Sequence, residues 1–80
     1  MKFELFTKEN CSGCVTLKAQ LGLDLLQLVN VRNIDEDKAG RAFIVSKGVR
    51  TVPACFVDDE QVPSRAFRDL LENQAAATSN

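Results

Sequence analysis

Hydrophobic and polar residues alternate at the start of the chain, and this alternation then changes to a wider spacing. In residues 2–7, single polar side chains stand between hydrophobic ones, which predicts a strand whose two faces meet different surroundings. From Ser12 onward, apolar residues recur at helical spacing through Leu17 and Leu21, and Gly22 is a suitable C-terminal stop. The pattern therefore predicts a strand that leads into a helix.

The middle of the chain repeats this order. Residues 25–34 are rich in Leu, Val and Ile and predict a second strand that ends near Asp35, with helix as the alternative for the first few residues. Either Asp35 or Asp37 can cap a second helix, and Gly48 closes it. The residues at helical spacing in that segment are Ala39, Ala42, Phe43 and Ser46.

The last third of the chain predicts a hairpin and a final helix. Residues 52–57 form a short apolar run, a pair of aspartates gives a turn signal, and residues 60–62 return as a brief antiparallel edge strand. Ser64 is a candidate N-cap for a helix that we expect to end near Asn73. Residues 74–80 are then expected to form a flexible tail.

The predicted order is strand, helix, strand, helix, strand, strand, helix, which is typical of the α/β class. Right-handed crossovers would place the first strands in parallel, and the hairpin adds antiparallel neighbours, so the expected sheet is mixed, four-stranded and flanked by three helices. A chain of 80 residues at this composition supports one domain, which we expect to span residues 1–80.

Composition excludes several classes of function. Hydrophobic residues make up 45% and charged residues 26%, and no apolar run approaches the length of a membrane span. The net charge of -1 gives no footprint for nucleic-acid binding. The residues that follow Met1 do not form the hydrophobic region of a signal peptide, so we expect the protein to act in the cytoplasm.

The strongest chemical signal is the segment Cys11-Ser12-Gly13-Cys14, which lies between the first predicted strand and the first predicted helix. A helix start carries unpaired backbone N–H groups and a partial positive charge, which favour a thiolate over a thiol. We therefore predict that Cys11 is the catalytic nucleophile. Cys14 lies within reach of the same turn, and we predict that it resolves a mixed disulfide formed at Cys11.

Other interpretations of the cysteines stay open. A zinc site normally needs four N or S ligands, whereas the chain has no His and 3 Cys in all, so we predict no metal site within the chain. An iron–sulfur cluster shared between two chains is a further alternative. Cys55 is expected to be a buried core residue, and its alternative role is that of a third redox thiol.

Residues 2–73 resemble the glutaredoxin branch of the thioredoxin superfamily. The resemblance rests on residues 7–14, which contain the paired cysteines, and on Thr51-Val52-Pro53 before the third predicted strand. It implies a thioredoxin-like fold and the activity of a dithiol–disulfide oxidoreductase that carries electrons. A binding module without turnover is the alternative function on the same fold.

The resemblance also implies a binding site for glutathione or another thiol substrate at Lys8, Thr51, Val52 and Pro53. In the family the proline follows a cis peptide bond and faces the dithiol, so Pro53 is expected beside Cys11. The backbone of Val52 would then pair with an extended substrate, as in strand addition. The basic residue at the position of Lys8 helps to bind glutathione or to lower the thiol pKa in glutaredoxins.

The resemblance leaves two electron donors open. The segment after the hairpin lacks the Gly-Gly pair that approaches glutathione in glutaredoxins, and residues 64–69 loosely resemble a segment of the NrdH-redoxins. NrdH-redoxins take electrons from thioredoxin reductase and pass them to ribonucleotide reductase. We therefore expect a monomer with no tightly bound cofactor, reduced by glutathione or by thioredoxin reductase, with a protein disulfide such as that of ribonucleotide reductase as its substrate.

Overall fold

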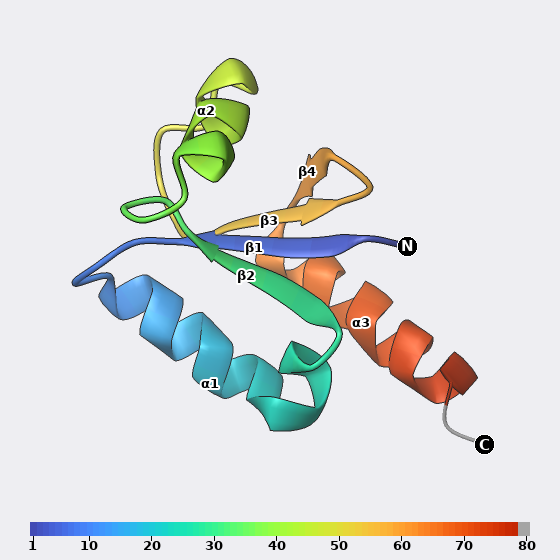
Figure 1. Cartoon of the computed structure of the whole chain (residues 1–80). Coiled ribbons are helices and arrows are strands. Elements are labelled where there is room, and N and C mark those ends of the chain that lie inside the picture. The colour runs from blue at the N-terminus through green and yellow to red at the C-terminus, as the bar shows by residue number, and fades with distance from the viewer. Residues whose placement is uncertain (79–80) are drawn as a thin grey trace.

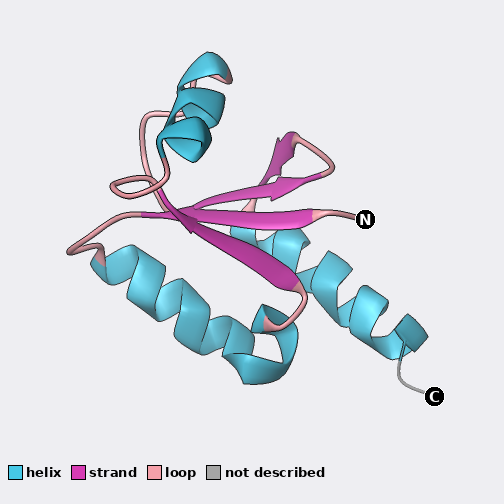
Figure 2. Cartoon of the chain, viewed as in Figure 1, coloured by secondary structure: helices cyan, strands magenta, loops and turns pink. Residues whose placement is uncertain are grey.

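The computed structural model describes residues 1–78 and contains a mixed sheet with helices on both faces. The strands follow the order β2-β1-β3-β4 across the sheet. Helices α1 and α3 cover one face and α2 covers the other, as Figures 1 and 2 show. The elements are β1 (Phe3–Thr7), α1 (Ser12–Leu26), β2 (Val29–Asn33), α2 (Lys38–Ser46), β3 (Ala54–Val57), β4 (Glu60–Val62) and α3 (Ser64–Thr78). The α/β class and the four-stranded mixed sheet predicted from the sequence are confirmed.

The strand directions follow from the connections between the strands. β1 and β2 pair in parallel, because α1 carries the chain from one end of the sheet back to the other. β3 pairs antiparallel with both β1 and β4, and the short turn at Asp58 and Asp59 closes the β3–β4 hairpin. Both turn residues have positive φ angles of 49° and 69°, which aspartate tolerates better than most residues.

The face of the sheet covered by α1 and α3 is held by apolar packing. Phe3 on β1 meets Phe67 on α3 edge to face, with ring centroids 5.7 Å apart. The buried cluster on this face comprises Phe3, Leu5, Leu17, Leu21, Cys55, Val57, Phe67 and Leu71. Its members are apolar side chains and the Cys55 thiol, so burial of apolar surface is what this cluster contributes to holding α1 and α3 against the sheet.

The face covered by α2 combines aromatic packing with buried charge. Phe6, Phe43 and Phe56 contact one another with ring centroids 5.1 to 5.7 Å apart. Beside them Glu4 is 4% exposed, and the guanidinium of Arg32 donates to its carboxylate at 2.9 Å. The same guanidinium lies 5.3 Å above the ring of Phe6.

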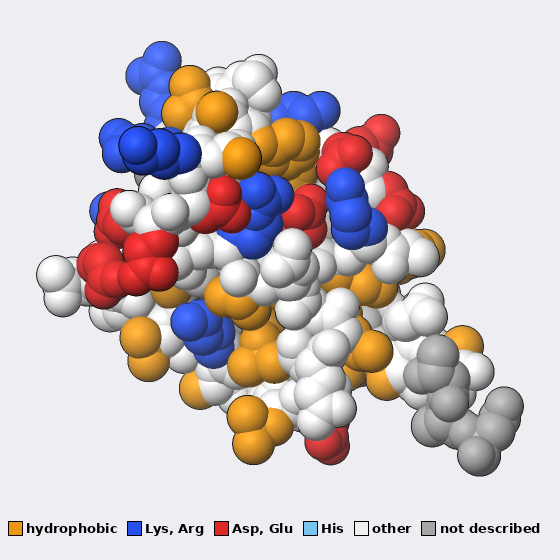
Figure 3. All heavy atoms as spheres, in the orientation of Figure 1, with side chains coloured by type: hydrophobic (Ala, Val, Ile, Leu, Met, Phe, Trp, Pro, Cys, Tyr) orange, Lys and Arg blue, Asp and Glu red, His pale blue; other side chains and the backbone are white. Residues whose placement is uncertain are grey.

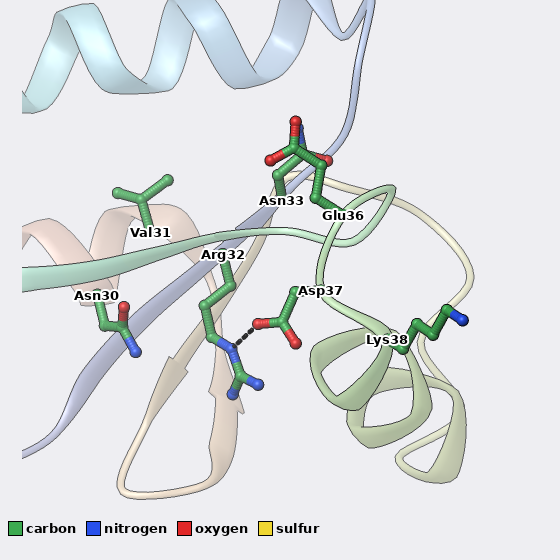
Figure 4. A pocket seen from close by; sticks show the side chains of 7 residues that line it. All are labelled: Asn30, Val31, Arg32, Asn33, Glu36, Asp37 and Lys38. Carbon is green, nitrogen blue, oxygen red and sulfur yellow. Dashed lines mark hydrogen bonds and ion pairs between the residues drawn. The ribbon is translucent and has the colours of Figure 1, made fainter.

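Arg32 also connects the sheet to the start of α2. It donates to the Asp37 carboxylate at 2.7 Å, and Figure 4 shows the two side chains pointing toward each other on the far side of β2 from Val31. Asp37 is the N-cap of α2 and accepts the Gly40 amide at 2.8 Å. The hydrogen bond from Arg32, followed by that from Gly40, lowers the pKa of the Asp37 carboxyl below its ordinary value.

Several predicted boundaries are wrong. α1 does not stop at Gly22: that residue is non-helical with φ 78°, but the chain resumes helix up to Leu26, so β2 begins only at Val29. Helix was the alternative for the first residues of that predicted strand, and it is the observed structure of Leu25 and Leu26. β3 begins at Ala54, because the two residues before it belong to a bend beside the dithiol.

The final helix differs from prediction at both ends. It begins at Ser64 itself, and the carbonyl of Pro63 accepts the first helical hydrogen bond from Phe67 at 2.9 Å, so Ser64 is not the N-cap. It continues to Thr78 rather than ending near Asn73, because the segment Gln74-Ala75-Ala76-Ala77 favours helix. Residues 79–80 of the predicted tail lie outside the described residues, and the predicted flexibility of the tail stays a prediction.

Candidate active site

The two cysteines of the motif lie at the N-terminus of α1 and form a disulfide, with their Cα atoms 5.2 Å apart. Cys11 is the N-cap, with extended backbone angles, and its sulfur accepts the Cys14 amide at 3.1 Å. Cys11 is partly exposed, whereas Cys14 is 2% exposed. Cys11 is therefore the more accessible of the two sulfur-bearing residues.

The segment before β3 lies directly against the dithiol. The Val52–Pro53 peptide bond is cis, and the Cys11 sulfur lies 3.7 Å from the Val52 carbonyl oxygen. On the other side, a Cβ atom added to Gly13 would lie 3.2 Å from the ring of Pro53. The predicted cis bond and the predicted approach of Pro53 to the dithiol are therefore confirmed, although the two segments are far apart in sequence.

The loop that carries Cys11 is held by the loop after β2. The Glu9 amide donates to Asp35 at 2.9 Å, and the Asn33 side chain donates to the Glu9 carboxylate at 3.0 Å. Asn10 follows with φ 53°, a left-handed conformation that asparagine tolerates. These hydrogen bonds fix the direction in which the chain reaches Cys11.

The sequence interpretation did not identify Asn33 and Asp35 as residues that hold the loop between β1 and α1, which we call the Cys11 loop. Asp35 was interpreted only as a candidate helix cap, and Asn33, inside the second predicted strand, was given no role. Their hydrogen-bond partner cannot be recognised from the local pattern, because Glu9 is separated from them by 24 and 26 residues. The helix cap itself is Asp37.

A cleft of about 630 Å³ opens between α2 and the Cys11 loop. Lys8 and Val52 line it, so two predicted binding residues meet there, and Lys8 also lines a neighbouring hollow with Cys11 and Cys14. Sequence reasoning missed the cations Arg41 and Arg50, which line the same cleft. Asp35, Ile34, Ile44, Val45, Gly48 and Val49 complete its lining.

Pro53 lines a separate groove beside Gly13, which shares no lining residue with this cleft. Thr51 is exposed and belongs to the lining of none of the hollows described above. The structure thus brings Lys8, Val52 and Pro53 around the dithiol and leaves Thr51 at the margin.

Cys55 occupies the core beneath this site. It is 3% exposed on β3 and packs in the apolar cluster with α1 and α3. Burial raises the pKa of its thiol to about 11, because the low-polarity surroundings disfavour the thiolate. The prediction of a buried core cysteine is confirmed.

Comparison with protein families decides the identity of this arrangement. The family model Glutaredoxin matches residues 3–62, three quarters of the chain, from the start of β1 to the end of β4. The chain belongs to the glutaredoxin family. A search of curated proteins and a search of solved structures gave no match.

Membership of the glutaredoxin family and the Cys11–Cys14 pair together support a thiol oxidoreductase with a thioredoxin-like fold. Within residues 1–78 no group of three or more His, Cys, Asp or Glu side chains could hold a metal ion. No helix in that same range is long and apolar enough to cross a membrane. The glutaredoxin match ends at β4, before α3 begins.

Proposed function

We propose that this glutaredoxin reduces disulfides by a dithiol mechanism in which Cys11 is the nucleophile and Cys14 the resolving thiol. The observation that carries the proposal is the position of Cys11, whose sulfur caps α1 and accepts the Cys14 amide at 3.1 Å. A hydrogen bond from an amide stabilises a thiolate more than a thiol, and the positive end of the helix acts in the same direction.

The reaction begins with the reduced protein. The Cys11 thiolate attacks one sulfur of a substrate disulfide, the substrate S–S bond breaks, and the other sulfur leaves as a thiolate. Cys14 then loses its proton and attacks the Cys11 sulfur, which releases the second substrate thiol and forms the Cys11–Cys14 disulfide. Two electrons pass from the protein to the substrate, and an external reductant must return them.

The cleft beside α2 supports glutathione as that reductant. Lys8, Arg41 and Arg50 line it, and Asp35 is the one acidic residue of its lining. Glutathione carries a net negative charge at neutral pH, so this cleft favours it electrostatically. The Val52 carbonyl, 3.7 Å from the Cys11 sulfur, lies where the backbone of a bound thiol substrate would run.

We further propose that the protein works as a monomer in the cytoplasm, with no tightly bound cofactor. Its substrate there would be a protein disulfide such as that of ribonucleotide reductase, and thioredoxin reductase is the alternative electron donor. Reducing conditions in that compartment keep Cys55 and the reduced dithiol as free thiols.

A donor comparison tests the source of electrons. The oxidised protein is mixed with glutathione or with NADPH and thioredoxin reductase, and the loss of the Cys11–Cys14 disulfide is followed in parallel. Fast reduction by glutathione is expected from the cationic cleft. Reduction by the reductase alone would replace glutathione with that enzyme, and reduction by neither would contradict the oxidoreductase proposal.

Substitution of each cysteine tests the mechanism. Cys11→Ser should abolish turnover, because it removes the attacking sulfur. Cys14→Ser should retain the first attack and accumulate a mixed disulfide that is visible by mass spectrometry. An unchanged rate of reduction of a protein disulfide by Cys14→Ser would show that the dithiol mechanism is wrong.

A further inference from the structure

A groove on the α1–α3 side of the dithiol has no role in the mechanism described above. It has a volume of about 430 Å³ and opens beside Ser12 and Gly13, the two residues between the paired cysteines. Pro53 and Cys55 form its inner end, and its other lining residues come from α1 and from the β4–α3 junction. The groove therefore begins at the two residues that separate the paired cysteines, and it shares no lining residue with the cleft beside α2.

A second hollow of about 270 Å³ extends this groove along the two helices. Leu17, Gln20 and Ser64 line both, and the second adds Arg65 and Arg68 of α3. Figure 1 shows α1 and α3 on the same face of the sheet, as their shared lining residues require. The two hollows adjoin at these shared residues, and we call them together the α1–α3 groove.

The charge of the α1–α3 groove is of one sign. Arginine supplies both of its charged lining residues, and the remaining polar side chains are the neutral hydroxyls and amides of Ser12, Thr16, Gln20, Gln61 and Ser64. Neither Glu60 nor Asp69, the acids nearest along the chain, is among the lining residues. An occupant with carboxylates therefore meets cations and hydrogen-bond donors with no acid in the lining, although Glu72 pairs with Arg68 from outside it.

Arg65 is the cation of the groove that remains available to a partner. Arg68 donates to Glu72 at 3.0 Å, whereas the Arg65 side chain makes no ion pair or hydrogen bond with any of the residues that the structure describes. Its place at the second residue of α3 adds the positive end of a helix to its own charge.

We propose that the α1–α3 groove binds an acidic segment that flanks the cysteine of a protein substrate, with Arg65 as the specificity-determining residue. This inference rests on the proposed oxidoreductase function and names its substrate class. A substrate cysteine bonded to Cys11 has one flank toward the cleft beside α2 and the other toward Pro53 and the groove. The groove therefore recognises acidic residues on one side of the cysteine only.

The test uses synthetic peptides that carry one cysteine as a mixed disulfide with 5-thio-2-nitrobenzoate. Attack by the Cys11 thiolate on the peptide sulfur breaks that bond and releases the coloured thiolate, so absorbance reports the rate. Two Asp residues stand before the cysteine in one peptide and after it in another, and a matched pair carries Lys instead. The mixed disulfide of 5-thio-2-nitrobenzoate with 2-mercaptoethanol is the reference, called neutral because its 2-mercaptoethanol half carries no charge.

The reduced wild-type protein should react faster with one Asp peptide than with its Lys counterpart, by about threefold to tenfold at low salt. Arg65→Glu should remove or reverse this preference for that one position of the acids and leave the rate with the neutral reference unchanged. A glutamate in the first turn of a helix is favourable, so the variant should fold. Arg65→Lys should keep most of the preference.

Lys38→Glu is the matched control, because Lys38 lies at the start of α2 in a different hollow on β2. It makes the same change in net charge and should leave the ratio of rates intact. An equal loss with Lys38→Glu, or an equal loss for both positions of the acids, would show a general field effect and overturn the groove. Wild-type protein that reacts with the neutral reference but not preferentially with either Asp peptide would overturn this inference alone. Failure with the neutral reference would instead contradict the oxidoreductase function.

Discussion

The two faces of the sheet are held together by different forces. Under α1 and α3 the contacts of the buried cluster are apolar and non-directional. Under α2 a buried carboxylate, Glu4, is paired with Arg32, which in turn holds Asp37 at the start of the helix. Figure 3 shows acidic and basic side chains intermixed over this part of the surface.

This difference corresponds to what each helix must position. α2 supplies Arg41 and Val45 to the cleft beside the dithiol, so its placement relative to β1 and β2 determines the shape of that cleft. Ion pairs and hydrogen bonds fix direction as well as distance, whereas apolar packing tolerates small displacements. The comparison teaches that buried charge here specifies where a helix lies.

The largest expected effect is on the apolar face. Phe67→Ala removes a fully buried ring that packs on Phe3, and it should lower the free energy of unfolding by about 3 to 5 kcal/mol. Urea unfolding followed by circular dichroism measures this change. Leu23→Ala is the control, because Leu23 is 81% exposed, and it should cost little. Equal losses for both variants would mean that α3 is not held by this packing.

The next effect concerns the ion pair on the α2 face. Arg32→Met leaves the buried carboxylate of Glu4 with only the more distant ammonium of Lys2, 3.8 Å away, and should lower the free energy of unfolding by about 2 to 4 kcal/mol. The double variant Glu4→Leu with Arg32→Met should recover much of that stability, since no buried carboxylate is then left without Arg32, and Asp37, which also loses Arg32, is partly exposed. If the ion pair specifies the position of α2, the NMR chemical shifts of Arg41 should differ from those of the wild type in the double variant even though its stability returns. A double variant as unstable as the single one would contradict the explanation by an unpaired buried carboxylate.

At alkaline pH the apolar face should be the weaker one. The Cys55 thiol has its pKa raised from 9.0 to about 11, so the folded protein keeps a proton that the unfolded chain releases. That stability is fully present below pH 9 and should be lost as pH rises toward 11, by about 2 to 3 kcal/mol. Cys55→Val should remove this part of the pH dependence of urea unfolding, and an unchanged alkaline slope would refute it.

At acid pH the smaller loss should come from the α2 face. The pKa of Asp37 is lowered below its ordinary value of 3.8, chiefly by Arg32, so its contribution is complete above that value and is lost as pH falls below it. Asp37→Asn retains a capping oxygen but loses the charge and should flatten the acid limb of stability against pH. Asp35→Asn, outside the ion pair with Arg32, serves as the comparison variant and should leave that part of the slope in place.

Local patterns predicted most of the fold but few of its long-range contacts. The dithiol and the β3–β4 hairpin are encoded within a few neighbouring residues, and the resemblance to a family supplied Pro53. The Glu4–Arg32 pair was not predicted, because its members are 28 residues apart and each alone resembles an ordinary surface residue. The extension of α3 was missed because Gln74-Ala75-Ala76-Ala77 has no large apolar residue to mark a buried face, although alanine favours helix.

The residues that hold the Cys11 loop were missed for the same reason, the long separation of the partners in the sequence. Asn33 and Asp35 have short polar side chains that serve equally well as caps, turn residues or loop clamps. Only the three-dimensional arrangement selects the contact with Glu9. The cations Arg41 and Arg50 were missed because α2 and the segment after it reach Lys8 only when the chain folds.

The hydrogen bond from the Cys14 amide to the Cys11 sulfur gives the protein an internal spectroscopic probe. A thiolate accepts this bond more strongly than a thiol or a disulfide sulfur does. The amide resonance of Cys14 should therefore shift downfield as Cys11 ionises and should differ again in the oxidised form. An NMR titration of this one signal would follow the charge on the Cys11 sulfur without an added reagent or a mutation.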